Sequence, residues 1–167
     1  MEMIKNFIFF LAFYMIISGF AYANGNIFPE KMGGFEKVSI TRGSEAIKSV
    51  KMLHRGSEIQ LNDAVVAKYA GGSGKKMIIW ASESSSVKEA EKLISRMNEK
   101  MPSSKMYRNF KSLKVNGCEV YSVDGMGMKN YYFVKEKWNY WLAVKADNSR
   151  VVLIDFMSNL ADCKSSE

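Results

Sequence analysis

Residues 118–145 constrain the fold more than any other stretch, because three short apolar and aromatic runs follow one another with only brief polar interruptions. The runs alternate with period two, which is typical of β-strands. An aspartate and two glycines within 124–127 tolerate the positive φ angles of a tight connection, and Glu136 with Lys137 stands at the second reversal. The sequence therefore predicts a three-stranded antiparallel meander that forms the floor of the domain.

Further strand patterns precede the meander. We expect strands at residues 35–41, 59–61, 64–70, 76–82 and 106–115, whereas residues 46–53 fit either a strand or a short helix. The Gly-rich stretch 71–74 is expected to connect two of these strands as a hairpin. Asn116 followed by Gly117 is the strongest short hairpin signal in the chain, and it leads into the meander.

Residues 86–101 show the clearest helical pattern. Ser86 and Glu89 form an S-x-x-E capping box, and apolar residues then recur on one stripe until Pro102 ends the helix. Because the opposite side is polar, this helix is predicted to lie on a sheet.

A second helix is predicted at residues 149–163, although a buried strand over 151–156 fits the same apolar residues. Together the patterns predict an α+β fold, in which an antiparallel sheet has two helices packed on one face. The stretches 64–82 and 119–136 share an order of strand, Gly-rich hairpin, basic residue and aromatic strand, so the sheet could consist of two pseudo-symmetric strand-hairpin-helix halves. Coincidence between two ordinary hairpins would give the same similarity.

The order of features across residues 50–160 resembles small exported bacterial proteins of unknown function that contain a repeated strand-hairpin-helix unit. Their repeats combine an acidic or polar turn, a strand with Ala and Tyr, a Gly-rich hairpin, an aromatic strand and an Ala-containing helix. The corresponding residues here are Asp63, Ala64, Tyr69, the GGSG turn at 71–74, Trp80 and Ala90. The resemblance includes no catalytic motif, so it implies a fold and an exported address, and no activity.

The N-terminus has the pattern of a cleavable secretory signal. Lys5 precedes an apolar run over residues 7–17, and Ala21 and Ala23 give the A-x-A arrangement that predicts cleavage after Ala23. The apolar run is shorter than the roughly 20 residues of a membrane-spanning helix, so we expect no permanent membrane anchor. The protein is therefore expected to be exported, either to the periplasm or out of the cell.

Three parts are expected along the chain: a signal peptide at 1–23, a flexible Gly- and Asn-rich leader at 24–34, and a single α+β domain at 35–167. The formal net charge is +7, but Lys and Arg are spread along the chain without a basic block, which favours plain solvation. In an exported protein such a charge would attract an anionic envelope component, and nucleic acid is not expected as a partner.

Cys118 and Cys163 are the two cysteines of the chain. In an oxidising compartment two thiols favour a single disulfide, which here would tie the meander to the C-terminal tail. On the chain-entropy model such a bridge would stabilise the fold by roughly 3–4 kcal/mol. The alternative is a pair of buried free thiols.

No set of residues has catalytic or metal-site spacing. His54 is the only histidine, and the motifs G-x-S-x-G, H-E-x-x-H and C-x-x-C are absent. We therefore expect a non-enzymatic protein without a cofactor. The alternative is a small envelope hydrolase or thiol redox protein that uses His54, Cys118 or Cys163.

Met126 and Met128 are weak candidates for metal ligands. Two thioethers at i and i+2 could bind Cu(I), with Met106 or Met32 as a further ligand. Methionine is also an ordinary filler of hydrophobic cores. A periplasmic Cu(I)-binding protein is thus a second alternative function.

Large rings occupy both faces of the last two strands of the meander. The candidate binding residues are Tyr131, Tyr132, Trp138, Tyr140 and Trp141. If the helices cover one face, the rings on the other face form an open aromatic surface, unless the N-terminal strands bury it. We therefore expect an exported binding domain that uses this aromatic face, with an envelope component, a ligand or a second copy of the chain as its partner.

Overall fold

The computed structural model describes residues 27–54 and 58–160. Eight strands form one sheet: β1 (Lys31–Met32), β2 (Phe35–Arg42), β3 (Asp63–Ala70), β4 (Lys76–Glu83), β5 (Tyr107–Val115), β6 (Cys118–Gly125), β7 (Met128–Lys135) and β8 (Trp138–Lys145). The helices are α1 (Gly43–Leu53), α2 (Val87–Lys100) and α3 (Ser149–Ser158), with short 3₁₀ helices η1 (Gly72–Gly74) and η2 (Met101–Ser103). None of the described helices is long and apolar enough to cross a membrane.

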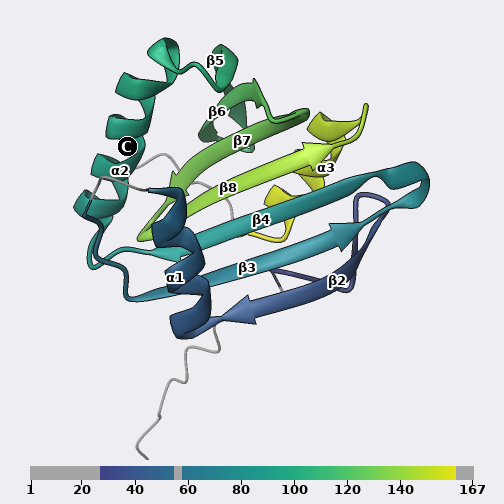
Figure 1. Ribbon diagram of the computed structural model, residues 1–167, viewed down its shortest axis with the longest axis horizontal. Coiled ribbons are helices and arrows are strands. Elements are labelled where there is room, and N and C mark those ends of the chain that lie inside the picture. Colours follow the sequence, from purple (N-terminus) through teal and green to yellow (C-terminus); the bar gives the residue numbers. More distant parts are fainter. Residues whose placement is uncertain (1–26, 55–57, 161–167) are drawn as a thin grey trace, which may run out of the picture.

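All neighbouring strands are antiparallel, in the order β1-β2-β3-β4-β8-β7-β6-β5 (Figure 1). The predicted meander is confirmed as β6, β7 and β8. Its last strand pairs with β4 over the full length of both strands, from Lys76 opposite Lys145 to Glu83 opposite Trp138. This single long-range pairing joins the two halves of the chain into one sheet. Whether the β3–β4 and β6–β7 hairpins are equivalent repeats stays a prediction.

The two consecutive residues Tyr131 and Tyr132 show how the helices are distributed. Successive side chains of a strand point to opposite faces of the sheet. The Tyr131 hydroxyl lies 3.0 Å from the Ser149 hydroxyl of α3, whereas the Tyr132 hydroxyl donates a hydrogen bond of 2.8 Å to the Asn98 side chain of α2. The helices α2 and α3 therefore cover opposite faces.

The predicted α+β class with an antiparallel sheet is confirmed, and two helices do pack on one face. They are α1 and α2, because the ambiguous stretch 46–53 is helical and its residues Ala46 and Val50 are buried against β3. The stretch 151–156 is also helical and belongs to α3, on the other face.

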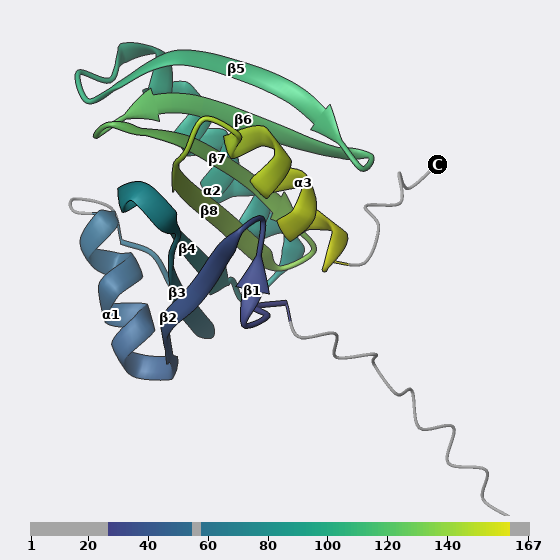
Figure 2. The ribbon, with the colours of Figure 1, turned by 90° about the vertical axis from the view of Figure 1, so that its right-hand side faces the viewer.

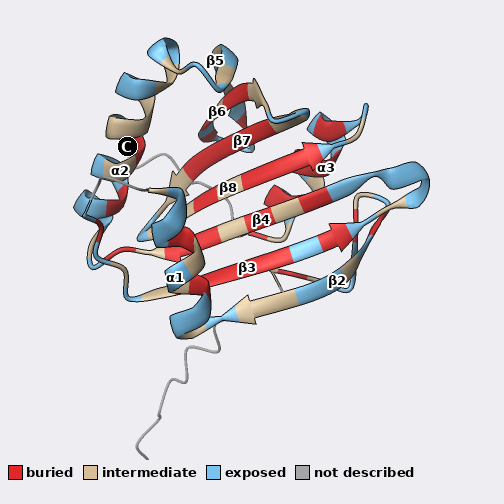
Figure 3. Ribbon diagram, viewed as in Figure 1, coloured by how far each residue is buried: buried red, intermediate tan, exposed pale blue. Residues whose placement is uncertain are grey.

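Hydrophobic cores lie on both faces of the sheet. The larger one lies under α3 and contains Phe133, Tyr140 and Phe156, and two smaller clusters lie under α1 and α2. Figure 3 shows the buried residues concentrated in the four central strands β3, β4, β8 and β7. Because both faces of these four strands are buried, the strands form the rigid centre of the sheet.

The N-terminal segment completes the core under α3, which corrects the predicted leader at 24–34 for its described part. Phe28 and Met32 are buried, and residues Lys31 and Met32 pair with β2 as the short strand β1. The Gly33 N–H donates a 2.6 Å hydrogen bond to the Asp155 carboxylate of α3. Composition predicted a flexible segment here because the glycines and asparagine outweigh these few apolar anchors.

The predicted signal peptide at residues 1–23 and Cys163 lie outside the described residues. Cleavage, export and the Cys118–Cys163 disulfide therefore stay predictions. Cys118 itself is buried at the start of β6, in the core under α3.

Candidate functional site

The five aromatic residues that the sequence singles out do not form an open surface. Tyr131, Tyr132 and Tyr140 are buried, and Trp138 and Trp141 are half-buried. The expectation of an open aromatic face is wrong because α2 covers one face, while α3 and the N-terminal segment cover the other. The burial of these rings on both faces of the sheet indicates that their main role is to stabilise the fold.

On the α2 side the rings form a continuous row across four strands. Tyr132 of β7 stacks between Tyr121 of β6 at 5.4 Å and Trp141 of β8 at 5.2 Å between ring centroids. Phe110 of β5 stacks on Tyr121, and Tyr107 meets Trp141 edge to face. Burial and the neighbouring Tyr121 raise the pKa of Tyr132, so its hydroxyl stays protonated and keeps its hydrogen bond to α2. The row is a rigid support for that helix.

The structure does not bring the proposed catalytic residues together. His54 follows α1 on one face of the sheet, and Cys118 lies in the core on the opposite face. Burial and then the positive charge of Lys100 lower the pKa of His54, which favours the neutral imidazole. The enzyme alternatives stay predictions, and no Cys–His pair connects these two residues.

Met126 and Met128 line one shallow hollow together with Met106, at the turn between β6 and β7. Lys105 and Arg108 line the same hollow, and their positive charges disfavour a cation there. No group of three or more His, Cys, Asp or Glu residues that could hold a metal ion occurs within residues 27–54 and 58–160. Binding of Cu(I) by the thioethers stays a prediction.

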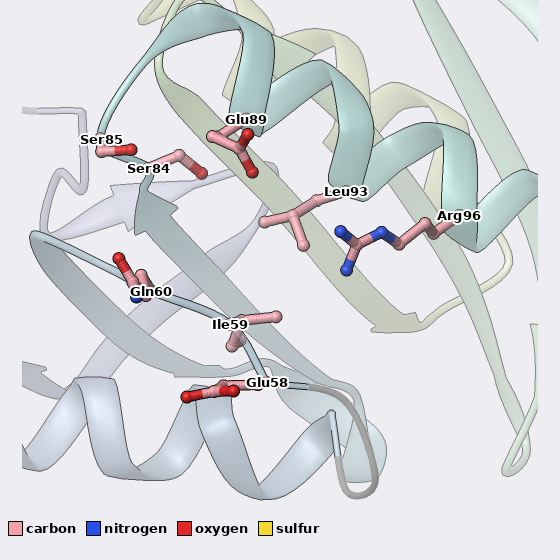
Figure 4. A pocket seen from close by; sticks show the side chains of 8 residues that line it. All are labelled: Glu58, Ile59, Gln60, Ser84, Ser85, Glu89, Leu93 and Arg96. Atoms are coloured by element: carbon pink, nitrogen blue, oxygen red, sulfur yellow. The ribbon is translucent and has the colours of Figure 1, made fainter.

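A cleft of about 410 Å³ lies between α2 and the segment that leads into β3 (Figure 4). Its lining residues are Glu58, Ile59, Gln60, Ser84, Ser85, Glu89, Leu93 and Arg96. The side chains of α2 point from the helix into the space beside residues 58–60. A volume of this size is typical of small-molecule sites in proteins.

Local interactions fix the helix wall of the cleft. The Ser86 side chain caps α2 by accepting a 3.2 Å hydrogen bond from the Glu89 N–H, as the capping box predicts. Ala90 is buried against the sheet, and its carbonyl accepts a 2.9 Å hydrogen bond from the Asn139 side chain of β8. The side-chain oxygen of Asn139 accepts a hydrogen bond from the hydroxyl of Ser84, which is also buried. The start of α2 is thus tied to the sheet at the cleft.

The opposite wall is a segment that the sequence predicts as a strand at 59–61. In the structure these residues have no strand pairing. Ile59 is buried in the cluster under α1, and the Asn62 N–H donates a 2.8 Å hydrogen bond to the Glu83 carbonyl at the end of β4. The segment therefore bridges α1 and the sheet end, and this leaves space beside α2.

Arg96 is a charged group of the cleft that has no partner among the described residues. Its guanidinium points into the cleft, and among the described residues it has no ion pair and no hydrogen bond (Figure 4). Glu89 also points into the cleft and lies 3.8 Å from Lys92, whereas Glu58 points away from Arg96. One side of α2 thus offers a carboxylate at one end, Leu93 in the middle and a guanidinium at the other end.

The sequence contains a signal for this cleft that the apolar stripe of residues 86–101 does not reveal. Glu89, Leu93 and Arg96 have the spacing i, i+4 and i+7, which places them along one line of a helix. The line runs beside the apolar stripe, so its middle residue is apolar and its ends are charged. What the sequence could not supply was the opposite wall at 58–60.

Comparison of the chain with protein-family models, with curated proteins and with solved structures finds no match. The interpretation of the cleft therefore depends on its own geometry.

Proposed function

We propose that the protein is an exported, non-enzymatic binding domain whose α2 cleft takes a short peptide with free termini. The observation that carries the proposal is the unpartnered guanidinium of Arg96, which points into a cleft that also presents Glu89. An arginine binds a carboxylate through two parallel hydrogen bonds, and the shelter of a cleft strengthens such a bond.

The dimensions favour a peptide of two or three residues. Glu89 and Arg96 are seven residues apart on α2, and at 1.5 Å per residue their backbones are about 10 Å apart along the helix axis. An extended peptide spans about 3.3–3.6 Å per residue, so a dipeptide or tripeptide reaches from one charge to the other. Its amine would lie near Glu89, its carboxylate near Arg96, and an apolar side chain against Leu93.

The surroundings of the serine hydroxyls in the cleft support a binding role and not a catalytic one. Ser84 donates its hydrogen bond to Asn139, so this hydroxyl serves the fold, and the other serine of the lining is the exposed Ser85. A serine nucleophile needs an adjacent base, and the lining of the cleft includes no histidine. Export through the signal at 1–23 and a Cys118–Cys163 bridge remain part of this proposal.

The proposal predicts that the protein binds alanine- and leucine-containing dipeptides and tripeptides, and that Arg96→Gln weakens this binding roughly 10- to 100-fold. Loss of one charge-assisted hydrogen bond costs about 1.5–3 kcal/mol, which corresponds to that factor in Kd. Isothermal titration calorimetry measures the constants. The matched control is Lys88→Gln, which removes a positive charge from an exposed position of the same helix outside the cleft.

Peptides with an amidated C-terminus provide a second control, because they lack the carboxylate that Arg96 is proposed to bind. The amidated peptides should bind the unsubstituted protein with a Kd similar to that of the free peptides for the Arg96→Gln variant. The Arg96→Gln substitution should raise the Kd of the amidated peptides only slightly. Absence of binding for every peptide of the panel, or equal binding by Arg96→Gln, would contradict the proposal.

A further inference from the structure

Basic residues gather at one end of the sheet, where β4 and β7 begin and where β6 and β8 end. We call this the basic end, and its members are Lys75, Lys76, Lys105, Arg108, Lys129, Lys145 and Arg150. The strands β3 and β8 point to the right of Figure 1, and Figure 2 turns that side toward the reader. Two aspartates lie at the same end. The Asp124 carboxylate lies 2.9 Å from the Lys129 ammonium and also accepts a hydrogen bond from Asn109, whereas the exposed Asp147 follows β8 and has no ion pair with a described residue.

Two lysines of the basic end stand directly opposite each other. Lys76 of β4 and Lys145 of β8 are cross-strand partners, and both are exposed. Like charges in this position destabilise a sheet. Neither lysine has an ion pair with any described residue. The repulsion is not relieved within the described part of the chain, and an anionic surface against this end would relieve it.

The two ends of the central strands differ in charge, because carboxylates accompany Lys135 and Lys137 at the end away from the basic end. At the far end, Asp63 of β3 stands opposite Glu83 of β4. The α2 cleft with Glu58 and Glu89 lies at that same end, because it is lined by residues that precede β3 and follow β4. A protein with this charge distribution orients on an anionic surface, with the basic end inward and the cleft toward the solution.

The basic end also exposes apolar side chains. Met106 and Met126 are 67% and 75% exposed, and they line a hollow of about 520 Å³ together with Lys105 and Arg108. Met126 occupies a turn position with φ of 54°, a conformation that favours Asn or Gly. Neither packing nor turn geometry explains these methionines. Flexible apolar side chains among basic residues are suited to the interface of a lipid bilayer, where the apolar groups insert and the cations contact the headgroups.

We propose that the basic end is a docking surface for a bilayer with anionic headgroups. Lys76, Lys145 and Arg108 would contact phosphates, and Met106 with Met126 would insert at the level of the headgroups. Such attachment is reversible and depends on ionic strength. It goes beyond peptide binding, because it would hold the protein at a membrane while the cleft stays open to solution.

Co-sedimentation with vesicles tests this proposal. The protein should sediment with phosphatidylglycerol mixed into phosphatidylcholine and stay in solution with phosphatidylcholine alone, and added salt should release it. The double variant Lys76→Glu with Lys145→Glu should bind the anionic vesicles at least about tenfold more weakly. The matched control is Lys48→Glu with Lys51→Glu, which reverses two exposed charges on α1. All variants share the same N-terminus, so any contribution of residues 1–23 cancels.

A second pair of variants separates a lipid surface from other polyanions. Met106→Ser with Met126→Ser should weaken vesicle binding while leaving binding to heparin unchanged. The proposal is overturned by failure to sediment with phosphatidylglycerol, by equal losses in the α1 control, or by stronger binding to heparin or duplex DNA than to the vesicles. The dissociation constants of dipeptides, measured by calorimetry on the same variants, should be unchanged. Failure of the membrane-docking proposal can therefore be distinguished from failure of the peptide-binding proposal.

Discussion

Replacement of Phe133 by alanine is expected to lower the free energy of unfolding by about 3–5 kcal/mol. Phe133 is fully buried in β7, stacks on Tyr140 at 5.1 Å, and meets Phe156 of α3 at 6.5 Å between ring centroids. The substitution removes a ring from the centre of the larger core, and the rigid neighbouring strands cannot close the cavity. Urea denaturation followed by circular dichroism measures the change.

The control for this variant is Met52→Ala, since Met52 is half exposed near the end of α1. Its effect should stay within about 0.5 kcal/mol, as is usual for surface positions. If Phe133→Ala cost less than about 1 kcal/mol, α3 could not be packed on this face of the sheet in the way described.

Gly125→Ala is expected to destabilise the protein by about 1–3 kcal/mol, because the position has no room for a side chain. Tyr107 of β5 lies directly opposite Gly125, and a Cβ atom on Gly125 would be 2.3 Å from the Tyr107 ring and 2.9 Å from the Met106 carbonyl oxygen. The Tyr107 ring would have to move, and its edge contact with Trp141 would be lost.

Removal of the ring should relieve most of this strain. In a Tyr107→Ala background, Gly125→Ala should therefore cost much less than it does alone, which a double-variant cycle of urea denaturation measures. Gly72→Ala is the control, because a Cβ atom there meets nothing within 4 Å. Additive costs of the two substitutions would show that the ring does not lie over Gly125.

Local patterns were sufficient to predict the meander and α2. Asn116 and Gly117 have φ angles of 49° and 77°, as a tight Asn-Gly hairpin requires, and Ser86 caps α2. These features depend on neighbours in sequence. For the same reason the local pattern does not decide between helix and strand at residues 151–156, since a short apolar run fits a strand and a buried helix equally well.

Long-range packing accounts for what the sequence did not predict. The alternation in β7 and β8 correctly placed rings on both faces, but the covering of a face depends on segments far away in the chain. Here that covering comes from Phe28 and Met32 near the N-terminus and from α3. The same limit applies to the cleft, because Arg96 acquires its role only where segment 58–60 stands opposite α2.

The two proposed surfaces lie at opposite ends of the central strands, which allows them to act independently. The end where Asp63 stands opposite Glu83 carries the cleft with Glu89 and Arg96, and the basic end carries Lys76 and Lys145. A protein held at a membrane by its basic end would still sample peptides from solution.

The most direct test of peptide binding is a ¹⁵N NMR titration of the protein with trialanine. We expect the largest shifts for the amide signals of the walls of the cleft, namely those of Ile59, Gln60, Ser84, Ser85, Leu93 and Arg96. Amides at the basic end, such as those of Lys76 and Met126, should not shift. Shifts confined to the basic end, or none at saturating peptide, would contradict the assignment of the α2 cleft as the binding site.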